Sequence, residues 1–213
     1  PFNLIVHQVI PAVAVGCPVI VKPARATPLS CINLVQCLHE AGLPEEWCQA
    51  VVCESALAEK MVTDSRVAFF SFIGSGAVGW KLHSKLAPGT RCALEHGGAA
   101  PVIVDADADL EEALPLLTKG GFYHAGQVCV SVQKVYVHED IVDLFSKGLI
   151  NLAEKLVVGD PLNAETEVGP LIQEKEVDRI DQWVHDAKNG GAKILTGGRK
   201  IGNTCYAPTV ILN

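Results

Sequence analysis

The sequence predicts an α/β protein with parallel sheets, arranged in two successive lobes. Short apolar runs bounded by Gly or Pro alternate with longer amphipathic stretches along the chain. Such runs are typical of strands buried in a parallel sheet, and their alternation with helices favours crossover connections between them. The double glycine at 97–98 is the best boundary, so residues 1–97 and 98–213 are predicted to form separate domains.

The first lobe is expected to alternate strands and helices. The predicted strands are residues 17–22, 49–53 and 67–72, and the predicted helices are the stretch between Thr27 and Gly42, residues 55–62 and the segment that opens at 74–79. In the first helix, Thr27 is a candidate N-cap, Pro28 takes the first helical position and Gly42 ends the helix. Apolar residues at every third position predict its buried stripe, which consists of Leu29, Ile32, Val35 and Leu38.

The second lobe is expected to follow the same pattern. Its predicted strands are residues 101–104 and 132–138, its predicted helices are residues 105–126, 140–156 and about 173–189, and a polar loop at 159–171 and the segment 191–198 complete it. The first of these helices begins with several acidic residues, which the helix dipole favours at that end.

The composition is that of an ordinary globular protein and disfavours several kinds of partner. The 213 residues are 49% hydrophobic and 19% charged, with a net charge of −7 and no basic block longer than two residues. Nucleic acids and anionic membranes are therefore poor candidate partners, and the apolar runs are too short to span a bilayer. Eight scattered cysteines without a C-x-x-C pair favour free thiols in a cytoplasmic protein, and no spacing indicates a metal site.

A glycine-rich loop, Gly74-Ser75-Gly76-Ala77-Val78-Gly79, follows a predicted strand and opens a helix. Glycines there let the backbone approach a ligand, and a helix N-terminus offers free N–H groups to a phosphate. The loop is neither the dinucleotide fingerprint nor a Walker A loop. Two interpretations therefore stay open, a phosphate-binding turn and an ordinary tight turn.

Charged side chains and one thiol stand beside other turns. Lys22 and Arg25 follow the first strand, at the kind of strand end where α/β proteins bind ligands, although exposed cations are common there. Cys129 follows a glycine-containing loop and is a candidate thiolate nucleophile. Glu95, just before the double glycine, is the candidate base, although such a carboxylate is more often solvated or part of a cap.

The order of these signals is more specific than any one of them. Along the chain come Lys22-Pro23-Ala24, Phe72-x-Gly-Ser-x-x-x-Gly, Leu94-Glu95-x-Gly-Gly and Gly126-Gln127-x-Cys129, and then Gly159-Asp160-Pro161, Val168-Gly169-Pro170-Leu171-Ile172 and Thr196-Gly197-Gly198. This series resembles the NAD(P)-dependent aldehyde dehydrogenase superfamily over essentially the whole chain, with Glu95 and Cys129 at the usual separation of 34 residues. The stretch 124–133 is most similar to the lactaldehyde and phosphonoacetaldehyde dehydrogenase branch.

The resemblance implies a fold and a division of labour. Residues 1–97 would be part of an NAD(P)-binding domain with a Rossmann-like parallel sheet, and residues 98–213 part of a second α/β domain that carries the catalytic thiol. Family members are more than twice as long, so the chain is expected to be the core of a longer polypeptide. Homo-oligomers are expected of the full-length form.

The resemblance also implies a reaction on a small aldehyde. Cys129 would attack the aldehyde to give a thiohemiacetal, hydride would pass to NAD or NADP, and water activated by Glu95 would cleave the resulting thioester to a carboxylic acid. Lys22 would hold the adenosine ribose of the cofactor. The residues along the pyrophosphate would be Gly74, Ser75 and Gly79.

Several positions depart from the family pattern. Arg25 replaces a Glu that grips the ribose hydroxyls in many members, and because a cation there could pair with a 2′-phosphate, it favours NADP. His96 replaces the apolar residue of Leu-Glu-Leu-Gly-Gly, Gln8 replaces a Lys, and residues 53–58 lack the usual glycines. These departures bear on cofactor affinity more than on Cys129.

The opening Pro1-Phe2-Asn3 resembles the lead-in to the oxyanion-stabilising Asn of the family. An ungapped match to the branch pattern Asn-Phe-Pro-x-Asn-Leu-x-x-His-Lys-x-x-Pro-Ala places Asn3 on the second Asn, and the oxyanion Asn before Pro1. Asn3 is therefore expected to be structural. Two alternatives to the dehydrogenase remain, a non-catalytic remnant used for association or small-molecule binding, and a cofactor-independent thiol esterase that uses Cys129 and Glu95.

Overall fold

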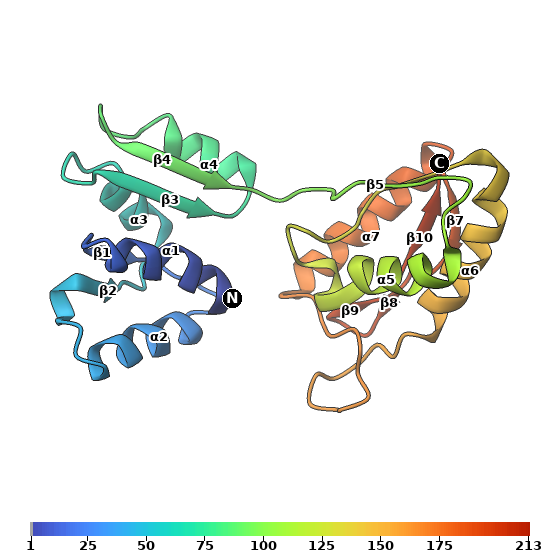
Figure 1. The fold of residues 1–213 in the computed structure, drawn as a ribbon, viewed down its shortest axis with the longest axis horizontal. Helices are drawn as coiled ribbons and strands as arrows, with labels where there is room; N and C mark the ends of the chain where they lie inside the picture. Colours follow the sequence, from blue (N-terminus) through green and yellow to red (C-terminus); the bar gives the residue numbers. More distant parts are fainter. Residues whose placement is uncertain (1) are drawn as a thin grey trace. The chain divides into compact units, whose positions relative to one another are not determined.

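The computed structural model describes residues 2–213, which form two compact units, Pro1–His96 and Gly97–Asn213. Unit 1 contains α1 (Phe2–Ala14), β1 (Val19–Val21), α2 (Leu29–Glu40), a 3-10 turn at Glu45–Trp47, β2 (Cys48–Ala50), α3 (Ser55–Val62), β3 (Phe69–Ile73), α4 (Gly76–His83) and β4 (Arg91–Glu95) (Figure 1). The predicted α/β class is confirmed, because β1 pairs with β2 and β3 with β4 in parallel, with helices in the connections. The strands pair in twos, rather than in one continuous sheet.

Helix α2 starts and ends through backbone contacts. The predicted cap at Thr27 is wrong, because the carbonyl of Pro28 accepts the first helical hydrogen bonds and no side chain caps this end. At the other end Gly42 has a φ of +97°, its N–H donates to His39 O at 2.9 Å, and Leu43 N–H donates to Leu38 O at 3.0 Å. This pair of bonds is a Schellman motif, which confirms Gly42 as the residue that ends the helix.

The predicted buried stripe of α2 is wrong at two of its positions. Leu29 is 70% exposed and Ile32 38% exposed, whereas Cys31, Leu34 and Val35 are buried. A step of three residues falls about 60° short of a full turn, so a stripe with that spacing drifts to the opposite face within three steps. The buried face instead packs with Val9 and Cys48 into the core of unit 1.

Unit 2 combines one parallel strand pair with two antiparallel ones. Its elements are β5 (Val102–Val104), α5 (Leu110–Phe122), 3-10 turns at Tyr123–Gly126 and Glu139–Ile141, β6 (Val135–Val137), α6 (Val142–Lys155), α7 (Glu174–Asn189), β7 (Lys193–Thr196), β8 (Lys200–Ile201), β9 (Cys205–Tyr206) and β10 (Val210–Leu212). The β5–β6 pair is parallel, whereas β7–β10 and β8–β9 are antiparallel. Helix α6 packs against β7 and β10 (Figure 1).

Helix α5 (Leu110–Phe122) is shorter at both ends than the helix predicted over 105–126. Asp109 caps it, because its carboxylate accepts hydrogen bonds from the N–H groups of Glu111 at 2.9 Å and Glu112 at 3.2 Å. The acidic residues therefore do lie at the N-terminus, as the helix dipole favours. The C-terminal end of the predicted helix is instead the turn Tyr123–Gly126, which has left-handed backbone.

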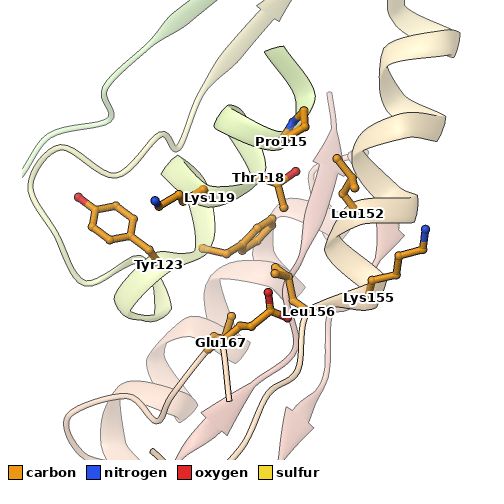
Figure 2. Close-up of a pocket in the computed structure, with 10 residues that line it drawn as sticks. Pro115, Thr118, Lys119, Tyr123, Leu152, Lys155, Leu156 and Glu167 are labelled. Carbon is orange, nitrogen blue, oxygen red and sulfur yellow. The ribbon is translucent and has the colours of Figure 1, made fainter. Parts of the chain in front are cut away.

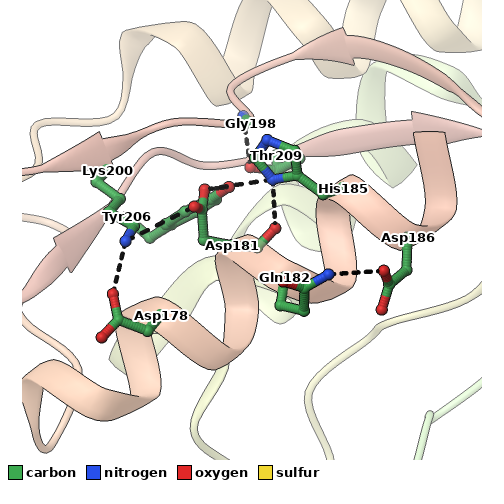
Figure 3. A network of polar contacts seen from close by, with 9 residues as sticks. All are labelled: Asp178, Asp181, Gln182, His185, Asp186, Gly198, Lys200, Tyr206 and Thr209. Carbon is green, nitrogen blue, oxygen red and sulfur yellow. Dashed lines mark hydrogen bonds and ion pairs between the residues drawn. The ribbon is translucent and has the colours of Figure 1, made fainter. Parts of the chain in front are cut away.

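A polar network fastens the β8–β9 hairpin to α7 (Figure 3). The buried Tyr206 donates its hydroxyl proton to Asp181 Oδ1 at 2.9 Å, and Lys200 Nζ lies 2.6 Å from Asp178 Oδ1. Burial, together with the Asp181 carboxylate, raises the pKa of Tyr206 above its usual range. The Tyr206 ring also packs with Leu171 and Val184, so apolar burial and a hydrogen bond act on the same residue.

Candidate active site

The thiol of Cys129 is exposed in the loop between the turn Tyr123–Gly126 and β6. The other cysteine of unit 2, Cys205, is buried, and all eight cysteines are free thiols. In unit 1, burial raises the pKa of Cys31 and Cys48, which makes them poor nucleophiles at neutral pH. Cys129 is therefore the accessible thiol of the described part of unit 2.

The turn before Cys129 has an unusual backbone. His124, Ala125 and Gly126 have φ values of 51°, 55° and 71°, so three successive residues lie in the left-handed region. Only glycine adopts this region without cost, and the other two residues must be held there by surrounding contacts. Backbone strain of this kind clusters at functional sites.

The chain that follows Cys129 is fixed to the end of α5. Ser131 is fully buried, and its hydroxyl lies 3.2 Å from Gly120 O and 3.1 Å from Gly121 O, within hydrogen-bond distance of both. Val132 N–H also donates to Gly120 O at 3.0 Å. A Cβ on Gly98 would lie 3.1 Å from Cys129 O, so this glycine allows a close approach of the loop backbone.

The role of Ser131 in fixing this loop was not predicted from the sequence. The only signal available was its small polar side chain two residues after the candidate nucleophile.

Glu95, the candidate base, is the exposed last residue of β4 in unit 1. It pairs with Ile73 of β3, and its carbonyl accepts a hydrogen bond from Gly74 N–H at 3.0 Å. Glu95 and the glycine-rich loop are therefore brought together at one end of the β3–β4 pair. Cys129 belongs to the other unit.

The glycine-rich loop leads into α4, and Ser75 occupies its N-cap position without a side-chain hydrogen bond. The N–H groups of Gly76 and Ala77 thus remain available to an anion, whereas Val78 N–H donates to Ser75 O at 3.1 Å. Gly74 and Gly79 have a separate explanation in packing, since a Cβ at Gly74 would lie 2.6 Å from the Phe72 ring and one at Gly79 would collide with His96 Nε2. The tight-turn interpretation therefore accounts for Gly74 and Gly79, and phosphate binding by the loop stays a prediction.

His96, which the sequence singled out as a departure from the family, lies against this loop. Its ring stands edge-on to Phe72 and Trp80, with centroid separations of 6.4 and 5.6 Å. Its Nε2 atom is buried and has no hydrogen-bond partner among the described residues. The ring fills the space that Gly79 leaves open.

The two basic candidates follow β1. Lys22 is half-buried directly after the strand, and Arg25 is exposed. Arg25 Nη1 lies 2.7 Å from Glu54 Oε2, and both side chains are largely exposed, at 61% and 74%. Glu54 was not anticipated as a partner, because 29 residues separate the two positions in the sequence. An exposed pair of this kind contributes little to stability but occupies the Arg25 guanidinium.

A pocket of about 440 Å³ lies between α5, α6 and the segment after α6 (Figure 2). Its apolar lining includes Phe122, Tyr123 and Leu152, and its cationic groups are Lys119 and Lys155. Glu167 also lines the pocket, and its Oε2 atom accepts a hydrogen bond from Val157 N–H at 2.9 Å, so the lining carries charges of both signs. This pocket could not be predicted from the sequence, since its lining is spread over residues 115–168.

Three further expectations from the sequence concern Asn3, metal ions and membrane-spanning helices. Asn3 lies exposed at the start of α1, and Pro1, on which its register also depends, lies outside the described residues. Over residues 2–213, no group of three or more His, Cys, Asp or Glu side chains is placed to hold a metal ion. No helix in this range is long and apolar enough to cross a membrane.

Comparison with known proteins assigns this α/β chain to a family. Residues 1–213 match the sequence profile of the aldehyde dehydrogenase family. The chain is 41% identical to a 3-sulfolactaldehyde dehydrogenase from Priestia aryabhattai, a match that covers all of this chain and 44% of that protein. The chain therefore belongs to the aldehyde dehydrogenase family, which confirms the resemblance seen in its motifs.

Solved structures give the same assignment. Lactaldehyde dehydrogenase from Escherichia coli superposes with a TM-score of 0.95 at 31% identity, over 99% of this chain and 45% of that one. Glyceraldehyde-3-phosphate dehydrogenase from Methanocaldococcus jannaschii, crystallised with NADP, gives 0.92 at 36% identity, over 98% and 46%. The chain spans less than half the length of these relatives.

Proposed function

We propose that this chain carries the nucleophile and the base of an NAD(P)-dependent aldehyde dehydrogenase, with Cys129 as nucleophile and Glu95 as base. The observation that carries the proposal is the exposed Cys129 thiol on a loop fixed by left-handed backbone and by the buried Ser131. Membership of the aldehyde dehydrogenase family supports it.

The residues of unit 1 fit a dinucleotide cofactor. The uncapped N-terminus of α4, with Ser75 and the adjoining Gly74 and Gly79, would hold the pyrophosphate, since the N–H groups of Gly76 and Ala77 are free for an anion. Lys22 would hold the adenosine ribose. When bound, NAD or NADP supplies the hydride acceptor for the oxidation.

The residues of the chain would act in three steps. The Cys129 thiolate attacks the carbonyl carbon, so that a C–S bond forms and the carbonyl oxygen becomes an alkoxide. That oxygen would be stabilised by the Cys129 backbone N–H. Loss of hydride leaves an acyl thioester on Cys129. Glu95 then takes a proton from water, the hydroxide adds to the thioester carbon, and the C–S bond breaks to release the acid and the thiolate.

The substrate we propose is a short aldehyde with a 2-hydroxyl group, in some cases with an anionic end. Three of the relatives are named for such aldehydes, namely 3-sulfolactaldehyde, lactaldehyde and glyceraldehyde-3-phosphate dehydrogenases, whereas others are named for succinate semialdehyde and betaine aldehyde.

The function is tested by turnover. The protein expressed from its complete coding sequence is expected to reduce NAD or NADP when given one of these three aldehydes, as followed by the absorbance of the reduced cofactor. Butanal, which lacks both the hydroxyl and the charge, serves as a control and should be oxidised more slowly. If no aldehyde in the panel yields reduced cofactor with either dinucleotide, the dehydrogenase proposal fails.

Cofactor choice is tested at Glu54. The Glu54→Gln variant is expected to bind NADP more tightly relative to NAD by about two- to fivefold, the factor that corresponds to releasing Arg25 from one exposed ion pair. The reason is that a freed guanidinium can pair with the 2′-phosphate of NADP. Calorimetric titration of both dinucleotides gives the ratio of the dissociation constants.

Glu46 is an exposed carboxylate in the turn Glu45–Trp47, so Glu46→Gln is the matched control and should leave that ratio unchanged. An unaltered ratio in Glu54→Gln would mean that Arg25 does not read the 2′-phosphate.

A further inference from the structure

We infer that Gln127 is a positioning residue that holds the left-handed turn His124–Gly126 closed and thereby fixes the orientation of Cys129. The inference rests on the proposed role of Cys129 as nucleophile. The Gln127 amide lies two residues before the thiol and would act on the reaction through Cys129, without touching the substrate.

Three hydrogen bonds of the Gln127 side chain carry the inference. Its Nε2 group donates to His124 O at 3.0 Å and to Pro170 O at 3.3 Å, and its Oε1 atom accepts from Ile172 N–H at 2.9 Å. The amide thus uses both of its donor hydrogens and its acceptor. It joins the turn before Cys129 to a segment more than 40 residues further along the chain.

The segment that Gln127 grips is itself anchored. Leu171, between the two contact residues, is buried in the core cluster of unit 2 with Val177, and its N–H donates to Thr204 O at 2.7 Å. The amide therefore ties the Cys129 loop to the core, because Leu171, which lies between its partners Pro170 and Ile172, is held by apolar packing.

The turn needs such a tie because its backbone is unfavourable. Left-handed φ values at His124 and Ala125 cost free energy that must be offset by contacts of the folded state. The carbonyl of His124 accepts two hydrogen bonds from Gln127, one from the side-chain Nε2 group and one from the backbone N–H at 3.1 Å. On the far side of the thiol, Ser131 fixes the loop to α5, so Gln127 and Ser131 hold Cys129 from both sides.

The test replaces Gln127 with methionine, which keeps the length and volume of the side chain and removes the three hydrogen bonds. In the protein expressed from its complete coding sequence, Gln127→Met is expected to lower kcat about tenfold while KM for the aldehyde changes less than twofold. A second substitution, His124→Gly, is expected to restore kcat at least threefold, because glycine adopts the left-handed backbone without cost. His124 is exposed, so its removal disturbs no core packing.

The control is Gln182→Met on α7. Gln182 is also exposed and also donates its amide, to Asp186 Oδ1 at 2.8 Å, but it lies away from the Cys129 loop in the chain. This variant should keep kcat and KM within twofold of the parent. A purely structural role of Gln127 would instead lower the melting temperature and the amount of active protein, and would leave kcat per active site and the alkylation rate of Cys129 at the values of the parent.

Alkylation of Cys129 separates failure of this inference from failure of the proposed function. The rate of iodoacetamide modification at Cys129, resolved by peptide mass spectrometry, is expected to fall at least threefold in Gln127→Met and to recover with His124→Gly. If the parent oxidises aldehydes but Gln127→Met keeps kcat within twofold, the inference is overturned and the proposed function stands. If the parent has no turnover, the proposed function fails, and an unchanged alkylation rate then overturns the inference as well.

Discussion

Replacing Cys129 with serine is expected to reduce aldehyde oxidation by about 10³-fold or more, since loss of an activated nucleophile removes the covalent route. Serine has nearly the same size and fits the same loop, but its hydroxyl is not ionised near neutral pH and attacks a carbonyl poorly without a dedicated base. No second accessible thiol is available in the described part of unit 2, because Cys205 is buried. The measurement is kcat with the best aldehyde of the panel, at saturating cofactor.

A matched control separates loss of the nucleophile from loss of a thiol in general. Cys37 is exposed on α2 of unit 1, and Cys37→Ser should retain the activity of the parent. The same two variants test the thiol esterase alternative, because ester hydrolysis without cofactor should disappear with Cys129→Ser if that activity exists. Substantial aldehyde oxidation by Cys129→Ser would mean that another group attacks the aldehyde.

The parts of the fold that could be predicted are those set by local sequence. Helix α3 was predicted at residues 55–62 and is found at Ser55–Val62, and the parallel pairs follow from apolar runs between helices. The antiparallel pairs β7–β10 and β8–β9 were not predicted, since β7 to β10 follow one another without the intervening helices that indicate a parallel pair. Their pairing depends on contacts such as Tyr206 with Asp181, which are remote in sequence.

The candidate site shows the same division. The motif order was enough to single out Cys129 and Glu95, because residue type and spacing are properties of the sequence. The contacts of Gln127 and Arg25 could not be predicted, since Gln127 meets Ile172 and Arg25 meets Glu54 only in the folded chain. His96 was noted as a departure, but its packing against Gly79 could not be read from either residue alone.

Replacing Glu95 with glutamine is expected to lower the steady-state rate of aldehyde oxidation by about 10²–10⁴-fold, the usual contribution of a general base. Glutamine keeps the shape of the side chain at the end of β4 and removes only its capacity to accept a proton. Because water attacks the thioester after the hydride has left, the loss should fall on hydrolysis. A burst of reduced cofactor, close to one equivalent per active site, should therefore precede a slow steady state.

The burst decides between two tasks for Glu95. If its only task is to activate water, Glu95→Gln keeps a fast burst and accumulates acyl-enzyme on Cys129, detectable as a mass increase in the intact protein. If Glu95 also deprotonates the thiol, the burst itself slows, and raising the pH should restore it as the thiolate forms without help. Glu45 is an exposed carboxylate of the turn Glu45–Trp47, so Glu45→Gln is the matched control and should show the kinetics of the parent. Unchanged steady-state turnover in Glu95→Gln would assign the base to another residue.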